Sequence, residues 1–328
     1  MPFLNFLAGR LAKGFLVLMA IAVLNFLLIR AAPGDPAMVM AGEAGAADAV
    51  FLEQLRQRFG LDKPFIEQLW LYLKGYLVLD LGFSYRQQQP VLGLIMTRLP
   101  ATLLLTGTAF VFSLGLGMVL GILAARRVGR ISDSAITLGA LVFYATPLFW
   151  VALLAQIVFA LKLGWVPNIG YETIGAGYTG LRRALDIGHH LILPALTLGL
   201  FFMALYARMM RASMLEVAGA DFVKTARAKG LSEGIITRRH VARNALLPVV
   251  TLAGLQAGQL VGGAVLTETV FAWPGIGLYL TNSLQVADMN AVLGGTLLVG
   301  AIFVGLNLLS DLLYALLDPR VRRRGGRP

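Results

Sequence analysis

Residues 247–272 read LPVVTLAGLQAGQLVGGAVLTETVFA, an apolar run whose one charged residue, Glu268, lies close to its end. A stretch of roughly 20 apolar residues is long enough to cross the hydrocarbon core of a bilayer as a helix. Small residues recur in this run, because Gly254, Gly258 and Gly262 follow at four-residue spacing and Gly263 adjoins the last. Such spacing lets helices approach closely in lipid. The run therefore predicts a transmembrane helix with a helix-contact face, although its glycines could also border a substrate path.

The composition of the whole chain also indicates a membrane protein. Of the 328 residues, 58% are hydrophobic and 14% are charged, whereas about a quarter of the residues of a soluble domain are charged. The absence of cysteine excludes disulfides, thiol catalysis and cysteine-ligated metals. A net charge of +11 would suggest a nucleic-acid partner for a soluble protein, but in a membrane protein the extra cations are expected on cytoplasmic loops.

Five further segments pass the same length test, so we expect an all-α integral membrane protein with six transmembrane helices. The spans lie at about 11–30, 101–125, 134–161, 191–212, 247–272 and 291–317. The first could be a signal peptide, but Arg30 follows it directly and no small-residue cleavage site is evident. The expected organisation is an N-terminal cytoplasmic end with the first helix (1–30), an external segment (31–100), a five-helix core (101–317) and a basic cytoplasmic tail (318–328). The second span carries Gly117 and Gly121, again at helix-contact spacing.

The positions of the cations predict the orientation. With the N-terminus inside, 18 of the 28 Lys and Arg residues lie near the inner ends of the spans, and ten lie outside. Because Lys and Arg favour the cytoplasmic side, both termini are expected in the cytoplasm. The same distribution accounts for the net positive charge and argues against nucleic acid as a partner. Asp311 lies inside the last span, where we expect an arginine as its packing partner.

Polar residues within the spans are few, and two roles remain open for them. The candidates to line an aqueous pathway are Tyr144, Gln156, Gln256, Gln259 and Thr267. Such groups can line a substrate path, or they can serve as hydrogen-bond partners between helices.

The sequence indicates no catalytic, metal or cofactor site. His189 and His190 are adjacent, and no third ligand is near them in sequence, so a capping or interfacial role is favoured over metal binding. The chain has no GxxxxGKS or GxxxxGKT phosphate loop. We therefore expect no enzymatic activity and no cofactor bound by this chain, and any ATPase must be another polypeptide.

The cytoplasmic loop at 213–246 is longer than a connector requires. Four apolar residues share one helical face: Leu215, Ala218, Phe222 and Ala226. Lys224 and Arg227 lie on roughly the opposite face, and Gly230 is expected to end this helix before a second piece at about 232–244. A solvated loop that touches anionic lipid heads is one interpretation. A docking surface for a cytoplasmic partner explains two short amphipathic helices better.

This loop resembles that of a known family. TARAKGL (225–231) and RHVARNALLP (239–248) are similar to the cytoplasmic loop of binding-protein-dependent ABC transporter permeases of the dipeptide/oligopeptide branch. Further similar motifs follow in the family's order: APGDP (32–36), GLDKP (60–64), DLGFSYRQQQPV (80–91), RLPATLLL (98–105), ETVFAWPGIG (268–277) and DLLYALLDPRVR (311–322). Lys224, Thr225 and Ala226 stand where the broad importer consensus has Glu-Ala-Ala, a difference that the peptide branch shares.

The resemblance implies a type I ABC importer transmembrane domain in the cell inner membrane. Its implied partners are a second permease subunit, two cytoplasmic ATPases that bind ATP and Mg, an extracytoplasmic solute-binding protein and membrane lipid. The implied ATPase contact is a coupling helix with residues Asp221, Phe222, Lys224, Thr225, Ala226, Arg227, Lys229 and Gly230. Segments 31–100 and 273–290 are candidates to receive the binding protein or to cap the bundle, and Trp273 is expected in the lipid headgroup region.

Di- or oligopeptides are the substrates that the resemblance favours. The same branch also serves nickel chelates, glutathione and some sugars, and specificity resides largely in the binding protein. A self-sufficient channel or secondary transporter is an alternative from another class, but the spans carry no chain of buried acids and histidines for a proton relay. A membrane enzyme is a third class, for which no set of catalytic groups is evident.

Overall fold

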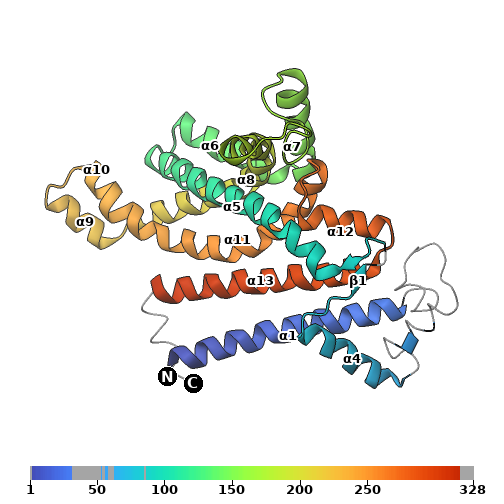
Figure 1. Ribbon diagram of the computed structural model, residues 1–328. Helices are drawn as coiled ribbons and strands as arrows, with labels where there is room; N and C mark the ends of the chain where they lie inside the picture. Colours follow the sequence, from blue (N-terminus) through green and yellow to red (C-terminus); the bar gives the residue numbers. More distant parts are fainter. Residues whose placement is uncertain (1, 32–52, 54–55, 58–62, 85, 318–328) are drawn as a thin grey trace. The chain divides into compact units, whose positions relative to one another are not determined.

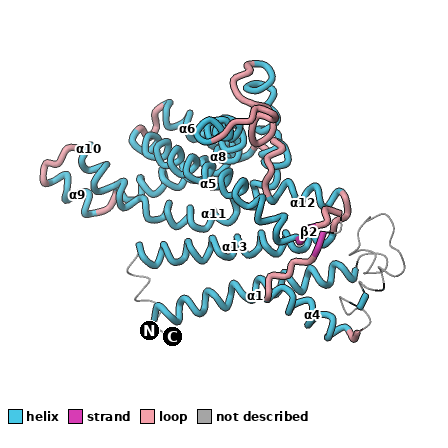
Figure 2. The backbone as a smooth tube through the Cα atoms, in the orientation of Figure 1, coloured by secondary structure: helices cyan, strands magenta, loops and turns pink. Residues whose placement is uncertain are grey.

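The structure is a computed structural model that describes residues 2–31, 53, 56–57, 63–84 and 86–317. The motif APGDP, most of GLDKP and the basic tail lie outside the described residues. Helices make up most of the described part, and a short two-stranded sheet accompanies them (Figure 2). The chain divides into two compact units, residues 1–102 with 274–328 and residues 103–273. The last helix thus belongs to the same unit as the first.

The first unit combines both ends of the chain. Its helices are α1 (Pro2–Ala31), α4 (Phe65–Leu77), the start of α5 (Val91–Arg126), α12 (Ile276–Gln285) and α13 (Met289–Leu317). An antiparallel hairpin pairs β1 (Phe83–Ser84) with β2 (Gln89–Pro90). α1 lies alongside α13 (Figure 1), and a Cβ built on Gly300 would come within 2.7 Å of Ile21. This close approach depends on a residue without a side chain.

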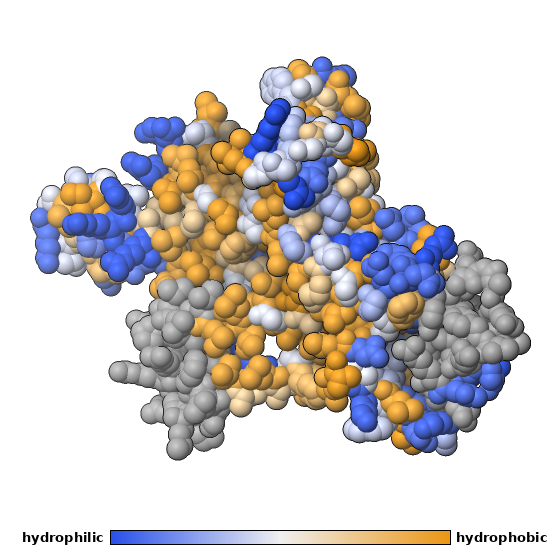
Figure 3. All heavy atoms as spheres, viewed as in Figure 1, coloured by the Kyte–Doolittle hydropathy of each residue, from blue (hydrophilic) through white to orange (hydrophobic). Residues whose placement is uncertain are grey.

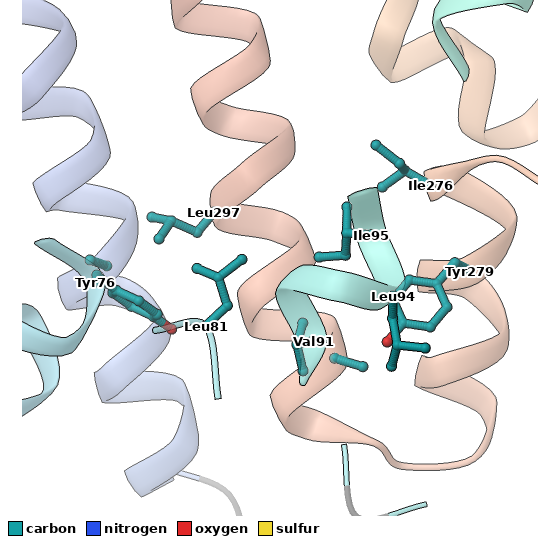
Figure 4. Packing of buried hydrophobic residues seen from close by; sticks show 10 residues of the cluster. Tyr76, Leu81, Val91, Leu94, Ile95, Ile276, Tyr279 and Leu297 are labelled. Carbon is teal, nitrogen blue, oxygen red and sulfur yellow. The ribbon is translucent and has the colours of Figure 1, made fainter. Parts of the chain in front are cut away.

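The apolar core of the first unit lies where its short segments meet the long helices. Figure 4 shows the labelled members of this core: Tyr76, Leu81, Val91, Leu94, Ile95, Ile276, Tyr279 and Leu297. The backbone N–H of Ile276 donates to Oγ1 of Thr102 at 2.8 Å and so ties the start of α12 to α5.

An ion pair joins the two long helices of the first unit near the chain ends. Nη1 of Arg10 lies 2.7 Å from Oδ2 of Asp311. The expected arginine partner of Asp311 is thereby confirmed. The pair also places the first turns of α1 beside the last turns of α13.

The second unit is a helix bundle arranged around α8. It contains the rest of α5, α6 (Ile131–Ala145), α7 (Leu148–Ala155), the π-helix η1 (Gln156–Lys162), α8 (Gly180–Ala218), α9 (Asp221–Ala228), α10 (Glu233–Ile235), the π-helix η2 (Ile236–Val241) and α11 (Ala242–Val270). α8 contacts α6, α7 and α11. Its many buried residues make it the central helix of this unit.

The described helices agree with the six predicted spans, with one bend that the sequence did not predict. Five helices are long and apolar enough to cross a membrane, and the pair formed by α6 and α7–η1 makes a sixth if it counts as one span. The two halves of this pair bend by 104°. The bend falls at Thr146–Pro147, where proline cannot donate the hydrogen bond of a continuous helix. α5 and α8 begin at Val91 and Gly180, well before the predicted starts at 101 and 191.

Glycines mark the closest approach between α5 and α8. A Cβ on Gly121 would lie 2.6 Å from the carbonyl oxygen of Ala207 and 2.6 Å from Cβ of Met210, and Gly117 is similarly crowded. This confirms the predicted contact face of the second span. In α11, Gly263 approaches Leu198 and Phe202 of α8, as expected.

The predicted contact face of the fifth span is wrong at Gly262. Among the described residues nothing lies within 4 Å of a Cβ built there. The four-residue spacing shows which glycines share one side of the helix. It does not show whether α8 packs on that side or on the side of Gly263.

The loop between η1 and α8 is attached to the start of α8 by an ion pair. Nε and Nη2 of Arg183 donate to the two carboxylate oxygens of Glu172 at 2.6 and 3.2 Å. The backbone N–H and the hydroxyl of Thr173 donate to the carboxylate of Asp186 at 2.7 and 2.8 Å. The Arg183 guanidinium lowers the pKa of the Glu172 carboxyl below its usual value.

The two adjacent histidines contact backbone carbonyls in the same region. Nε2 of His189 lies 3.0 Å from the carbonyl oxygen of Trp165, and Nδ1 of His190 lies 2.9 Å from that of Asp186. Within the described ranges, no group of three or more His, Asp or Glu residues could hold a metal ion. His189 therefore connects the loop to α8, whereas the contact of His190 lies within α8.

Trp273 lies inside the second unit, so its expected place in the headgroup region is wrong. Its side chain is 0% exposed. Its ring meets the edge of Tyr171 with the ring centroids 4.7 Å apart. The N–H of Trp273 donates to the carbonyl oxygen of Glu268 at 2.9 Å, which turns the chain at the end of α11 and directs the ring inward.

The close approach of α5 and α8 generates a stability prediction. Gly121→Ala should destabilise the protein by about 1–3 kcal/mol, because the new methyl group overlaps backbone atoms of α8 and forces the helices apart. Gly107→Ala, where nothing described lies within 4 Å, should leave stability unchanged or slightly higher. Thermal unfolding in detergent, followed by circular dichroism, measures both. Equal melting temperatures for the two variants would contradict the packing described for Gly121.

The Glu172–Arg183 pair generates a prediction about pH. Because the pKa of Glu172 is lowered in the folded loop, the pair stabilises the ordered loop above the ordinary carboxyl pKa. That stabilisation is lost as the pH falls through the lowered value. Hydrogen exchange of residues 165–180, corrected for the intrinsic exchange rate, should show less protection at a pH of roughly 3 than at neutral pH. In the Glu172→Gln variant, the part of this pH dependence that comes from Glu172 should disappear. An unchanged exchange profile in the variant would show that the Glu172–Arg183 pair does not stabilise the loop.

Candidate functional site

The candidate site is the segment between α8 and α11, residues 219–241. It consists of α9, a turn at Gly230, α10 and η2. Figure 1 shows α9 and α10 projecting beyond the ends of α8 and α11. Hydrophilic side chains gather on this projection in Figure 3. The segment therefore presents a surface away from the bundle of the second unit.

A break separates α9 from α8, where the sequence predicted one continuous apolar face. α8 ends at Ala218 and α9 begins at Asp221. Gly219 in the gap has a low helix propensity, and the carboxylate of Asp221 is favourable in the first turn of a new helix. As a result Val223 is fully buried, whereas Phe222 is 45% exposed. The prediction was wrong for Phe222 because the break changes the direction of the helix.

The turn at Gly230 confirms the predicted end of the helix. Gly230 has a φ of 75°, a left-handed conformation that glycine adopts without strain. Its N–H donates to the carbonyl oxygen of Arg227 at 2.9 Å, and the N–H of Leu231 donates to that of Ala226 at 3.4 Å. These two bonds form a Schellman motif, which satisfies carbonyls at the end of a helix.

The inner face of α9 packs on the helical segment that follows the turn. Val223 and Ile236 are 0% exposed, and Ala226 and Val241 are also buried. α9 and η2 are in contact. The two arms of the segment therefore share a small apolar core, which holds them together as one body.

An ion pair that the sequence did not predict links the two arms. Nε of Arg227 donates to Oε1 of Glu233 at 2.8 Å. The partners are 46% and 68% exposed, so solvent screens the pair and it contributes little to stability. The sequence feature that could have indicated this pair is the opposite charge of Arg227 and Glu233 on either side of Gly230. A recess of about 370 Å³ adjoins this pair and is bordered by Arg126, Met214 and Ile236.

Most of the predicted coupling-helix residues lie on the outside of this body. The exposed ones are Asp221, Phe222, Lys224, Thr225, Arg227, Lys229 and Gly230. Nζ of Lys224 lies 2.8 Å from Oδ1 of Asp221. Ala226 is 5% exposed and lies on the inner face of α9, in the small apolar core. The outer face thus combines an exposed aromatic ring with exposed charges, a composition suited to a protein partner.

A second unpredicted ion pair fastens the end of α8 that leads into α9. Nε and Nη2 of Arg211 donate to the two carboxylate oxygens of Asp133 at 2.7 and 2.8 Å. The backbone N–H of Gly129 donates to the same carboxylate at 3.1 Å. The Asp133 side chain is 7% exposed, and the removal of one partner of such a pair leaves an uncompensated charge. The pair therefore ties the start of α6 to α8.

Two of the five candidate pathway residues are buried and already hydrogen-bonded within the second unit. Nε2 of Gln156 donates to the carbonyl oxygens of Asn168 and Val270 at 3.0 and 3.2 Å. Thr267 is 1% exposed, and its hydroxyl lies 3.5 Å from the carbonyl oxygen of Gly263. These contacts join η1, the following loop and the end of α11.

The other three candidates keep part of their surface open. Tyr144 is 41% exposed and stacks on Phe201, with ring centroids 5.4 Å apart. The guanidinium of Arg208 lies over the Tyr144 ring at 4.5 Å. In α11, Gln259 is exposed and Gln256 is half-buried.

Solved structures with a similar fold are membrane transporters. The MetNI methionine ABC transporter, in inward-facing conformations, matches with a TM-score of 0.50 and 22% identity over 72% of this chain and 98% of that chain. An amino acid ABC transporter matches with a TM-score of 0.51 and 16% identity over 70% of this chain and 94% of that chain. The fold is that of a type I ABC importer transmembrane domain, as the sequence predicted.

Sequence relatives extend over nearly the whole chain. The dipeptide transport system permease protein DppB of Alkalihalophilus pseudofirmus is 38% identical over 93% of this chain and 96% of its own. DppB of Escherichia coli K12 is 38% identical over 98% of this chain and 99% of its own. The di/tripeptide permease protein DppB of Pseudomonas aeruginosa is 39% identical over the same shares.

Two family descriptions match the sequence directly. One, the N-terminal part of the membrane component of binding-protein-dependent transport systems, matches residues 3–106. The other, the inner membrane component itself, matches residues 117–323. The matches agree with the apolar helices of both units, so the chain is a multi-pass inner-membrane permease subunit. The chain belongs to the family of binding-protein-dependent transport system inner membrane components.

Proposed function

We propose that this chain is the transmembrane subunit of an ATP-driven importer that moves dipeptides or oligopeptides across the inner membrane. The observation that carries the proposal is the outward face of α9, a short helix held clear of the bundle on a rigid turn. The names of full-length relatives, which refer to dipeptides or di- and tripeptides, support the substrate class. The substrate would arrive on an extracytoplasmic binding protein.

Both termini are proposed to lie in the cytoplasm. The Arg10–Asp311 pair supports this topology, because it joins the start of α1 to the end of α13 at one side of the membrane. The excess of Lys and Arg at the inner ends of the spans indicates that this side is the cytoplasmic one. The α9 segment then faces the cytoplasm as well.

The proposed cytoplasmic partners are two ATPase subunits, which would bind ATP and Mg. α9 would enter a groove of one of them, with Phe222 as the central contact. Exposed aromatic rings at the centre of an interface commonly contribute most of the binding energy. Lys224 and Lys229 would then lie around it as a charged rim. A second, similar permease subunit would complete the membrane domain and receive the second ATPase.

The α9 segment is suited to transmit movement into the bundle. Its apolar core and the Gly230 turn hold α9 and η2 together, so a force on α9 moves both arms. One arm continues into α8 and the other into α11, which contact each other. Closure of the ATPase pair would thereby shift two spans at once and bias the pathway between inward- and outward-open states. The ATPases supply the free energy that any such shift requires.

On the external side, we propose that segments 31–100 and 273–290 receive the binding protein. Along the pathway, Gln256, Gln259 and Tyr144 are proposed to meet the peptide directly, because they keep open surface. Gln156 and Thr267 are proposed to shape the pathway wall, since their polar groups are engaged in hydrogen bonds.

The proposed ATPase contact is tested by Phe222→Ala. Loss of a central aromatic contact should cost about 2 kcal/mol or more, which corresponds to a roughly thirty-fold weaker association. Co-purification of the ATPase subunits and uptake of a labelled dipeptide in cells should both fall. Ile174→Ala, at a 99% exposed apolar residue in the η1–α8 loop, is the matched control and should change neither. Full retention of the complex and of uptake in Phe222→Ala would show that α9 does not dock the ATPase.

The rigidity of the α9 segment is tested by charge reversal. Arg227→Glu places two acids across the turn from each other, and we expect a several-fold loss of uptake, because their repulsion loosens the contact between the two arms. Arg227→Glu combined with Glu233→Arg restores the attraction and should recover most of the uptake. If the double variant stays as defective as the single one, Arg227 acts through contact with the ATPase and not through the pair.

A further inference from the structure

α4 has one side that packs on α1. The rings of Phe65 and Tyr72, two turns apart on α4, both contact the ring of Phe26, with centroids 5.5 Å apart in each case. Nη2 of Arg30, near the end of α1, donates to Oε1 of Gln68 at 2.9 Å. These contacts define the side of α4 that faces α1, the helix beside which α4 lies in Figure 1.

The opposite side of α4 exposes an apolar stripe. Ile66, Trp70 and Leu77 are 79%, 61% and 56% exposed. At 3.6 residues per turn, these three positions fall within about 40° of one another around the helix axis. A stripe of this size exposed to water would be unfavourable, and exposed apolar patches usually mark an interaction surface.

The position of α4 along α1 shows what surrounds the stripe. The apolar span of α1 runs over Leu7–Leu28. Phe26, which contacts two rings of α4, lies about 6 Å below Arg30 along the helix, at a rise of 1.5 Å per residue. Tyr76 of α4 belongs to the same buried cluster as Ala22, one turn deeper. α4 therefore lies beside the last turns of the membrane span and not beyond them.

α1 itself exposes apolar side chains at this level. Leu24 and Leu28 are 58% and 61% exposed, as expected of positions that face lipid. The stripe on α4 lies at the same depth, so the lipid layer that covers α1 also reaches α4. A helix that lies in the interface buries its apolar face by about 5–10 Å below the headgroups, which is the depth of Phe26.

The polar residues of α4 fit this position. Glu67, in its first turn, is paired with Lys63 at 2.7 Å, close to the level of Arg30 where headgroups are expected. Lys74 is exposed near the other end, and its long side chain can reach the headgroups while its methylene groups remain among the lipid chains. Trp70 is a residue type that favours the boundary between headgroups and acyl chains.

We propose that α4 is a membrane anchor whose stripe, Ile66, Trp70 and Leu77, inserts into the phospholipid leaflet at the C-terminal end of α1. In the proposed orientation this is the outer leaflet. The anchor goes beyond the proposed import function and does not depend on it. It places α4 in the lipid boundary. The hairpin β1–β2 and α12 are then the described parts of the first unit that remain available to contact a binding protein.

The absence of cysteine from the chain permits a direct test. Single cysteines at Ile66, Trp70 and Leu77 of the full chain are modified with a nitroxide spin label and reconstituted in phosphatidylethanolamine–phosphatidylglycerol vesicles. Collision with oxygen, which concentrates in lipid, is compared with collision with a polar nickel chelate. Leu24→Cys in α1 provides the lipid reference, and Ser232→Cys in the hydrophilic segment between α9 and α10 provides the aqueous reference. All five positions are exposed, so the substitutions should not affect folding.

The expected result is a severalfold higher ratio of oxygen to nickel collisions at the three α4 positions than at Ser232, close to the ratio at Leu24. A ratio equal to that at Ser232 would place the stripe in water and overturn the proposal. Protection from both reagents would mean that a protein, such as a second copy of this chain, covers the stripe, and would overturn it equally.

Discussion

The absence of water from the bilayer core requires every backbone N–H and C=O group there to find a partner within the protein, and this structure depends on that requirement throughout. Regular helices meet it by themselves. The bent pair α6 and α7–η1 does not, because Pro147 interrupts the helix. Gln156, at the start of η1, donates to the carbonyl oxygens of Asn168 and Val270. The carbonyl of Val270 belongs to the last turn of α11, where helical partners run out. One buried amide thus satisfies a carbonyl in the loop after η1 and another at the end of α11.

The same requirement explains why the spans could be predicted from the sequence. A run of apolar residues that crosses the bilayer must be helical, so hydropathy and length located the five long described helices and the bent pair α6 and α7–η1. The Gly230 turn was also predictable, because its signal is a single residue at the end of a periodic pattern. The break at Gly219–Ala220 was not, since the helical spacing of the apolar residues continues across it. The exposure of Phe222 follows from that break and was missed with it.

Long-range contacts differed in how far the sequence could predict them. For Asp311 the type of partner could be expected, because an acid inside a span needs a cation. The structure shows that this cation is Arg10. The pair of Asp133 and Arg211 joins residues 78 positions apart, and both lie where surface charges are ordinary. Trp273 was assigned from the usual preference of its residue type. Its burial against Tyr171 depends on the path of a loop that no local pattern specifies.

The packing around α8 determines how a displacement of α9 could spread. α9 follows α8 across a short break, and the Asp133–Arg211 pair fastens that end of α8 to α6. At Gly117 and Gly121 the backbones of α5 and α8 are so close that neither helix can slide without moving the other. α5, α6 and α8 are therefore expected to move together. The bend at Pro147 lies between α6 and α7, where the hydrogen-bond ladder is already interrupted, so the angle between these two helices can change at a lower cost than within a continuous helix.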